Sequence, residues 1–213
     1  MSERDAKADQ YARKAAGWSD AEYADGAAYL AHRAELVATL GVTLAAGDEV
    51  LDLACGDGGL GEHLVGRGLR YLGVDSEPAM VEAAQRRLGA RAELLEGDLN
   101  TFAPERPVAA TTVFRAIYYA DDRPAFFRRV AGFTERKLVF DLNPRQYRVE
   151  DVVADLRAAG LVHIQLHPFL FPQRHGLPRP LARALRAAEH SGFVARALLR
   201  VRFSYLVSAS RTG

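Results

Sequence analysis

A glycine-rich stretch carries the strongest chemical signal in this chain of 213 residues. It reads LDLACGDGGLGEHL over residues 51–64, and Gly56, Gly58 and Gly61 match the spacing G-x-G-x-x-G. This spacing is typical of loops in which a bare backbone approaches the pyrophosphate of a dinucleotide. The stretch predicts either a dinucleotide site or a site for another ligand that needs the same close approach.

The charges around this loop favour a cationic ligand. Between residues 49 and 66 the acidic side chains are Glu49, Asp52, Asp57 and Glu62, and this stretch contains no Lys or Arg. An anionic pyrophosphate would meet like charges there, each costing on the order of 1 kcal/mol at about 4 Å. A ligand with positive charge would be attracted, so the charge pattern argues against a dinucleotide.

Further acidic residues end the next two apolar runs. Asp75 ends YLGVD, nineteen residues after Gly56, and EGDL supplies Gly97, Asp98 and Leu99. In an open parallel sheet the ligand lies beyond the carboxyl ends of the strands. We therefore expect three successive strand ends to present an acidic residue to one crevice.

Together these segments resemble the class I S-adenosylmethionine-dependent methyltransferases. The first motif of that family is an acidic residue followed by a glycine-rich turn, and Asp52, Ala54, Gly56 and Gly58 are similar to it, with the third glycine shifted to Gly59. S-adenosylmethionine carries a sulfonium and an ammonium group, which suits an acidic loop. The resemblance covers residues 25–160 by motif and implies a methyl transfer that leaves S-adenosylhomocysteine.

The resemblance also implies which residues contact the cofactor. Asp52 would face the ammonium group directly or through water, Asp75 would accept hydrogen bonds from both ribose hydroxyls, and Asp98 would hold the adenine amino group. The full set of expected cofactor-binding residues is Tyr23, Arg33, Asp52, Ala54, Cys55, Gly56, Asp57, Gly58, Asp75, Ser76, Met80, Gly97, Asp98, Leu99, Arg115 and Ala116.

Some positions leave alternatives open. Arg115 pairs either with the cofactor carboxylate or a substrate anion, or with an acidic residue at 121–122 on the surface. Cys55 lies either near the cofactor or in the core as a small buried side chain, and we favour the second because free cysteines are usually buried. Alanines stand at 109–110, where many relatives begin the fourth strand with Asp.

Methyl transfer from a sulfonium needs an aligned nucleophile and a dry site. A base is needed only for a nucleophile that keeps its proton, such as a carbon or oxygen acceptor. The expected catalytic residues are Tyr118, Asp141 and His167, and the wider set of candidates adds His32, Tyr119 and His175. Asn143 ends the same predicted strand as Asp141 and should point into the same cleft. His163 and His167 share one face of a predicted strand, but two histidines without a third ligand do not indicate a metal site, and we expect none.

Two segments outside the glycine loop are candidates for covering the site. A helix predicted over residues 20–40, with Asp20 as its cap, carries Tyr23, Tyr29 and Arg33 as lid residues or as packing residues. An insertion near residues 172–196 combines apolar positions with arginines: Arg174, Arg179, Arg183 and Arg186. It fits a hydrophobic or anionic substrate, peripheral contact with a membrane surface, or a helix on the sheet edge with a solvated basic face.

The elements that position these residues alternate regularly. Apolar runs predict strands at 49–54, 71–75, 92–98, 109–117, 137–143, 161–171 and 197–211, and helical patterns fill 60–68, 76–89 (with Ser76 as cap), 122–133, 149–160 and 181–190. We expect an α/β fold with a Rossmann-like, seven-stranded, mostly parallel sheet, helices on both faces and an antiparallel last strand pair. The whole chain, 1–213, is predicted to be one domain with a helical cap (1–45), a cofactor-binding core (46–160) and an edge strand pair (161–213).

The composition limits the classes of partner that the chain could bind. A net charge of +1 without a basic run gives no footprint for nucleic acid, and one cysteine excludes an internal disulfide. The first residues lack an apolar segment, so we expect a cytoplasmic protein with no integral membrane segment. The predicted function is O-, N- or C-methylation of a small molecule in specialised metabolism. The alternatives are an NAD(P)-dependent oxidoreductase and a non-catalytic S-adenosylmethionine-binding protein.

Overall fold

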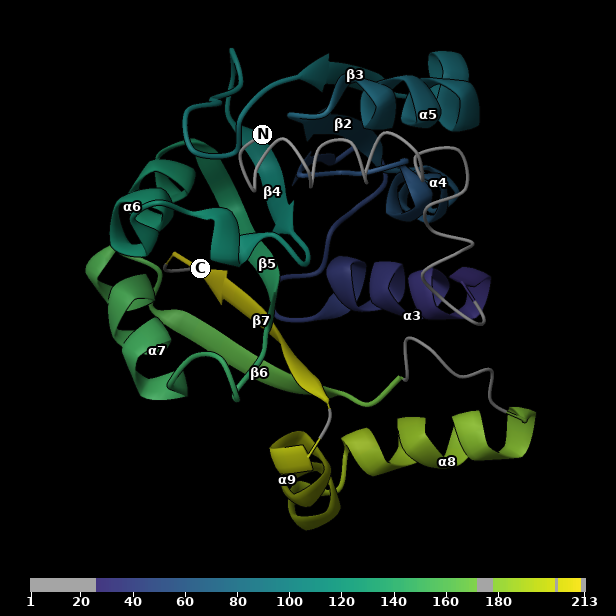
Figure 1. Ribbon diagram of the computed structural model, residues 1–213, viewed down its shortest axis with the longest axis vertical. Helices are drawn as coiled ribbons and strands as arrows, with labels where there is room; N and C mark the ends of the chain where they lie inside the picture. Colours follow the sequence, from purple (N-terminus) through teal and green to yellow (C-terminus); the bar gives the residue numbers. More distant parts are fainter. Residues whose placement is uncertain (1–25, 172–177, 202, 212–213) are drawn as a thin grey trace, which may run out of the picture.

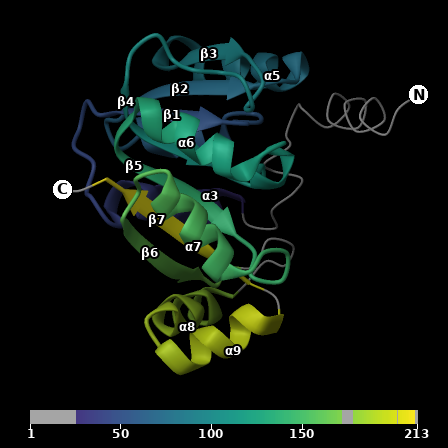
Figure 2. The ribbon, with the colours of Figure 1, turned by 90° about the vertical axis from the view of Figure 1, so that its left-hand side faces the viewer.

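A computed structural model describes residues 26–171, 178–201 and 203–211. The chain forms a seven-stranded sheet in the order β3-β2-β1-β4-β5-β7-β6 (Figures 1 and 2). β7 pairs antiparallel with β5 and β6, and the other neighbouring strands pair in parallel. This confirms the predicted Rossmann-like sheet with its antiparallel last pair. The predicted cap Asp20 lies outside the described residues.

The strands are β1 (Glu49–Leu53), β2 (Arg70–Asp75), β3 (Glu93–Glu96), β4 (Val108–Val113), β5 (Thr134–Leu142), β6 (His163–Phe169) and β7 (Ser204–Ser210). The helices are α3 (Gly26–Thr39), α4 (Gly59–Val65), α5 (Pro78–Leu88), α6 (Arg123–Phe133), α7 (Val149–Ala158), α8 (Arg179–Glu189) and α9 (Gly192–Val201). Short 3-10 turns occur at η1 (Gly89–Arg91) and η2 (Ile117–Tyr119).

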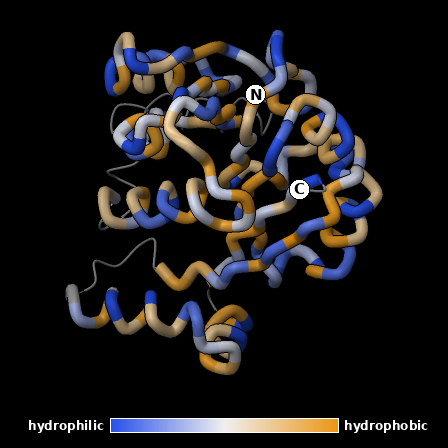
Figure 3. The backbone as a smooth tube through the Cα atoms, turned by 180° about the vertical axis from the view of Figure 1, so that it is seen from behind, coloured by the Kyte–Doolittle hydropathy of each residue, from blue (hydrophilic) through white to orange (hydrophobic). Residues whose placement is uncertain are grey.

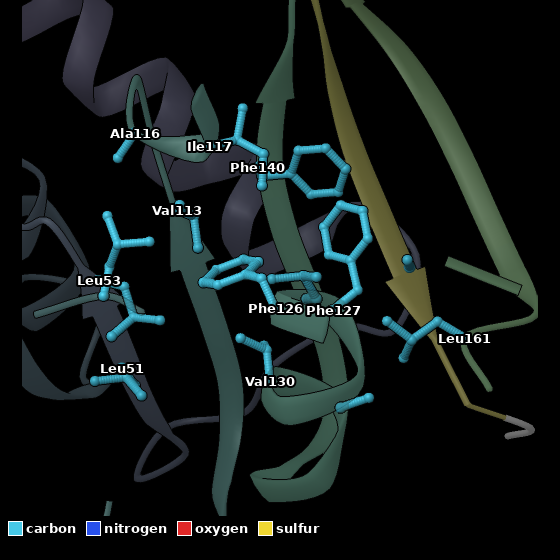
Figure 4. Close-up of a cluster of buried hydrophobic side chains, with 14 of the residues drawn as sticks. Leu51, Leu53, Val113, Ala116, Ile117, Phe126, Phe127, Val130, Phe140 and Leu161 are labelled. Carbon is cyan, nitrogen blue, oxygen red and sulfur yellow. The ribbon is translucent and has the colours of Figure 1, made fainter. Parts of the chain in front are cut away.

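Helices cover both faces of the sheet, which is why its central strands are buried. Figures 1 and 2 show α6 and α7 on one face and α3 and α4 on the other. All residues of β1 and β4 are buried. In the core drawn in Figure 4, Phe126, Phe127 and Val130 of α6 pack against Val113 of β4 and Phe140 of β5.

Several predicted boundaries differ from the structure by a few residues, among them the start of α5 and the end of β4. The cap of α5 is Glu77 and not Ser76, and the Asp75 carboxylate accepts the N–H of this cap residue. The strand predicted over 109–117 ends at Val113, and the chain then turns through η2.

The prediction of one long strand over 197–211 was wrong. Residues up to Val201 belong to α9, and the strand begins only at Ser204. Ala195 and Leu199 lie one helical turn apart and are both buried, so the helix gains an apolar contact that the strand-like alternation of the sequence conceals. α8 and α9 form a helical hairpin beyond the β6 edge of the sheet (Figure 1). None of the described helices is long and apolar enough to cross a membrane.

A buried lysine on the sheet donates a hydrogen bond to the carbonyl that follows the C-terminal end of α3. The Nζ atom of Lys137, on β5, donates to the Leu40 carbonyl at 2.8 Å, and the Ser208 hydroxyl donates to the same oxygen at 3.1 Å. Burial, with a smaller effect from the positive charge of Arg136, lowers the pKa of Lys137 from 10.5 to about 7.

This pKa predicts how stability depends on pH. Between pH 7 and 10.5 the unfolded chain keeps the lysine proton while the folded protein loses it, so the free energy of unfolding should rise with pH across this window. Urea unfolding at pH 7, 8 and 9 measures the slope. Lys137→Met should remove this rise, and an equal slope in the variant would show that another group is responsible.

Candidate functional site

The glycine-rich loop joins β1 to α4, and Asp75 at the end of β2 holds it in place. Ala54, Gly56 and Gly58 have left-handed φ angles of 61°, 57° and 73°. One Asp75 oxygen accepts the Gly56 N–H at 2.8 Å, and the other accepts the Glu77 N–H at 3.0 Å. Burial raises the pKa of Asp75. This carboxylate therefore fixes both the loop and the start of α5.

Asp52 lies within the sheet beneath the loop. Its two oxygens accept hydrogen bonds from the Tyr71 hydroxyl on β2 at 2.7 Å and from the Thr112 hydroxyl on β4 at 2.6 Å. Burial raises the pKa of Asp52 to about 6, despite these two hydrogen bonds. Because both oxygens already have partners, direct contact of Asp52 with a cofactor ammonium stays a prediction.

The acidic side chains of the loop have a basic partner that lies outside the motif. Arg87 of α5 bonds to the Asp57 carboxylate at 2.9 Å and to the Glu62 carboxylate at 3.3 Å. Glu49 is paired with Arg106 at 3.2 Å. The premise that these acids lack basic neighbours is therefore wrong for the folded chain. The attraction for a cationic ligand rests instead on the carboxylates near the ends of β1 and β2.

The residues expected at the adenine lie close to the end of β2. The Gly97 N–H donates to the Asp75 carbonyl at 2.9 Å, which draws the end of β3 toward β2. Asp98 is exposed and accepts a hydrogen bond from the Asn100 N–H at 2.8 Å. Ser76 is exposed, whereas the expected neighbours Met80, Leu99 and Ala116 are buried.

Cys55 is buried, with an exposed fraction of 8%. A Cβ atom added at Gly73 would lie 3.1 Å from its sulfur, so the thiol fills the space beside β2. Burial raises the pKa of the thiol well above its ordinary value. The cysteine is thus packed as a small core side chain and is not poised as a thiolate.

The ends of β4 and β5 are joined by a backbone hydrogen bond. Arg115, directly after β4, has a left-handed φ of 54°, which is uncommon for a residue other than glycine. Its N–H donates to the Asp141 carboxylate at 2.7 Å. The Asp122 carboxylate accepts the Ala125 N–H and caps α6. The strained turn therefore aims the Arg115 side chain into a cavity beside Asp141.

This cavity has a volume of about 560 Å³ and lies between α3, the ends of β4 and β5, the end of β6 and the start of β7. Its walls are aromatic rings, arginines and a few polar groups: Tyr29, Arg33, Arg115, Ile117, Tyr118, Asp141, Asn143, Arg145, Gln146, Tyr147, Phe169, Phe171, Phe203, Ser204, Tyr205 and Leu206. Asp141 is the one carboxylate among these residues, against three arginines. The cavity thus favours a ligand with an apolar or aromatic body and an anionic group.

Arg33 forms part of the wall contributed by α3. It is 3% exposed, and its guanidinium carbon lies 4.3 Å from the Phe114 ring centre and 4.7 Å from the Tyr29 ring centre. The guanidinium also donates a hydrogen bond to the Tyr29 hydroxyl. These contacts fix a positive charge at the side of the cavity nearest β1 and β4.

The two candidate histidines His32 and His167 meet at a carboxylate outside the cavity. Glu189, on α8, accepts from the His32 ring at 2.9 Å, the His167 ring at 3.4 Å and the Leu170 N–H at 2.8 Å. Burial opposes its ionisation, but these hydrogen bonds outweigh burial and lower the pKa of Glu189 to about 2. Arg186 donates to the other His32 nitrogen at 2.6 Å. Both histidines thus connect α3, β6 and α8, and neither lines the cavity.

The remaining candidate residues do not all lie at the cavity. Tyr118 lines the cavity and is 47% exposed, whereas Tyr119 beside it does not line the cavity. His163 is exposed on the edge strand β6. Tyr23, Arg174 and His175 lie outside the described residues, as does the side chain of Arg179. Within the described ranges, no group of three or more His, Cys, Asp or Glu side chains could hold a metal.

Part of the cavity wall was missed from the sequence. Arg145 follows β5 and donates to the Phe203 carbonyl at 3.1 Å and to the Leu199 carbonyl at 3.3 Å. It thereby joins the cavity to the α9–β7 connection. The only sequence signal was the position of NPRQY after the fifth strand.

Residues 50–137 match a family model described as a methyltransferase domain. The uncharacterized methyltransferase C70.08c of Schizosaccharomyces pombe is 36% identical over 90 residues, which cover 42% of this chain and 34% of that protein. The matched region spans about a third of the length of the curated relatives.

Solved structures share the fold over most of the chain. A chain from the complex between the Haloferax volcanii Trm112 methyltransferase activator and a methyltransferase has a TM-score of 0.67 and 18% identity, covering 95% of this chain and 98% of that one. Magnesium protoporphyrin IX methyltransferase of Synechocystis with bound SAM has a TM-score of 0.58 and 15% identity, covering 87% and 78%. At these identities the likeness shows the fold.

The raised pKa of Asp52 predicts pH-dependent binding of S-adenosylmethionine. A cationic ligand favours the ionised carboxylate, so its affinity should increase as the pH rises from about 5 to about 7 and then level off. Calorimetric titration at several pH values measures this, with Asp52→Asn as the matched variant. The affinity of the variant should depend less on pH. An unchanged pH dependence would show that the charge of Asp52 does not affect cofactor binding.

Proposed function

We propose, from the match of residues 50–137 to a methyltransferase-domain family model, that the chain transfers the methyl group of S-adenosylmethionine to a small-molecule acceptor. The observation that carries the proposal is the position of Asp75. Its carboxylate is bonded to the glycine loop after β1, and the 560 Å³ cavity lies at the ends of β4 and β5. The glycine loop is suited to a cofactor, and the cavity is suited to an acceptor.

The residues present fit the expected cofactor. Each Asp75 oxygen accepts one backbone N–H and keeps acceptor capacity for a ribose hydroxyl. The left-handed turn at Ala54 and Gly56 leaves partly exposed backbone at the end of β1. Arg33 supplies a buried positive charge for the carboxylate of the methionine part. When bound, S-adenosylmethionine supplies an activated methyl group.

The chain's own contribution is to orient the acceptor and exclude water. The aromatic rings of the cavity hold an apolar body, and the arginines attract an anionic group. We assign proton removal from the acceptor to Asp141, whose position is fixed by the Arg115 N–H, and orientation of the acceptor to Tyr118. His167 has no place in this scheme because its ring bonds to Glu189 away from the cavity.

A cavity of this size supports a small molecule as substrate. The structural relative bound to Trm112 is a reason to test for a protein partner as well. The Rossmann-like sheet is also compatible with an NAD(P)-dependent oxidoreductase, but the carboxylates near the loop disfavour a pyrophosphate.

Cofactor binding tests the assignment of Asp75. Asp75→Ala should weaken binding of S-adenosylhomocysteine by roughly 1–3 kcal/mol, because charge-assisted hydrogen bonds are lost. Isothermal titration measures the affinity, and Asp151→Ala on the exposed first turn of α7 is the matched control. Thermal unfolding of both variants separates lost binding from lost structure. An unchanged affinity, or tighter binding of NAD than of S-adenosylhomocysteine by the unmodified chain, would refute the proposal.

Methyl transfer tests the roles of Asp141 and Tyr118. Incubation with radiolabelled S-adenosylmethionine and a panel of phenols, carboxylates, amines and lipids should label at least one acceptor class. For an oxygen or carbon acceptor, Asp141→Asn should lower kcat on the order of 100-fold, whereas Tyr118→Phe should mainly raise KM. A kcat unaffected by Asp141→Asn would exclude it as the base. Cofactor binding with no labelled acceptor would favour the non-catalytic alternative.

A further inference from the structure

The hairpin formed by α8 and α9 differs in charge from the rest of the chain. Residues 178–201 contain five arginines and a single acidic residue, Glu189, which gives the hairpin a net charge of +4 in a chain of net +1. Glu189 is 5% exposed and bonded to two histidines, so it adds no negative surface. The solvent-facing charges of the hairpin are therefore basic.

The same hairpin exposes large apolar side chains. Phe193 is 81% exposed and Val201 is 78% exposed, and Leu181 and Val194 are 48% and 44% exposed. These four make up half of the large exposed hydrophobic residues in the described part of the chain. A concentration of this kind on a short segment marks an interaction surface rather than scattered surface apolarity.

The outer face of α9 is distinct from the face that packs on the protein. Ala195 and Leu199 are buried against it, whereas Phe193 and Val201 project on the other side of the helix. At 100° per residue, Arg196 and Arg200 lie beside this outer apolar stripe. Figure 3 shows hydrophobic and hydrophilic residues interleaved along the hairpin.

Three arginines of the hairpin keep their charge available. Among the residues that the structure describes, Arg183, Arg196 and Arg200 form no ion pair, and all three are exposed. Arg186, by contrast, is held by Glu35 and His32 of α3. The outward surface thus combines available positive charge with an apolar stripe.

We propose that the outer face of the α8–α9 hairpin docks onto the surface of a membrane that contains anionic lipids. Phe193 and Val201 enter the boundary between headgroups and acyl chains, and the neighbouring arginines contact lipid phosphates. This is the arrangement of helices that lie in the plane of an interface, with basic side chains extending from an apolar face. The proposal is independent of the reaction that the chain catalyses.

The positive charge of the hairpin favours an anionic membrane over a second copy of the chain as its partner. A symmetric dimer through the hairpin would bring the same arginines of both copies together. The face offers no exposed carboxylate to neutralise them, whereas an anionic bilayer does so directly. The hairpin also lies beside the cavity, because Arg145 bonds to the Leu199 and Phe203 carbonyls. Docking would place the acceptor cavity near the membrane surface.

Vesicle binding by the full chain tests the proposal. Flotation with phosphatidylcholine vesicles containing roughly one third phosphatidylglycerol should recover the protein at low salt, and pure phosphatidylcholine should recover far less. Recovery should fall at about 0.5 M salt. Phe193→Ser with Val201→Ser, and separately Arg196→Gln with Arg200→Gln, should each weaken binding roughly tenfold.

Matched controls lie elsewhere on the surface. Leu95→Ser changes an exposed apolar residue on β3, the opposite edge strand, and Arg128→Gln with Arg157→Gln changes exposed arginines on α6 and α7. These variants should bind vesicles like the unmodified chain. Thermal unfolding and S-adenosylhomocysteine binding check that every variant is folded.

Three results would overturn the proposal. The first is equal recovery with neutral and anionic vesicles, and the second is equal loss of binding in the control variants. The third is a concentration-dependent dimer in light scattering that Phe193→Ser with Val201→Ser abolishes, because the face would then be covered by a second copy. Failure of vesicle binding leaves the methyltransferase proposal untouched, because its tests use cofactor affinity and methyl transfer.

Discussion

The carboxylate of Asp75 is the interaction on which the geometry of the site depends. It accepts one N–H from the loop after β1 and another from the start of α5, so two segments that carry expected cofactor contacts share one fixed reference point. The parallel pairing of β1 with β2 and β4 brings the three strand ends to the same edge. Burial makes this carboxylate costly to ionise, and the two donors offset part of that cost.

The loop shows how far sequence reasoning could go and where it stopped. Glycine spacing and strand-end acids predicted the position of the site because both follow from local chain geometry. The electrostatic environment of the loop, in contrast, depends on residues that are distant in the sequence. Arg87 reaches Asp57 and Glu62 only because α5 packs beside α4, and no spacing rule within the motif encodes that contact. The family resemblance pointed to the right fold, although one premise of the charge argument was wrong.

The fold beyond β5 was harder to predict for a related reason. Central strands buried on both faces stand out as apolar runs, so β1, β2, β4 and β5 were found with small boundary errors. In residues 197–201 the alternating pattern suggested a strand, but burial of Leu199 against the protein selected a helix. The part of the cavity wall formed by Arg145 and Phe203 also could not be predicted, because these residues come together only through the antiparallel position of β7.

Glu189 gives the hairpin a mechanical role. Its three donors belong to α3, β6 and the segment that follows β6, so moving the hairpin away from these elements would break three hydrogen bonds to an ionised carboxylate. α3 and the hairpin should therefore move together as one rigid body. A displacement of the hairpin on contact with a surface would therefore be transmitted through α3 to Tyr29 and Arg33 in the cavity wall.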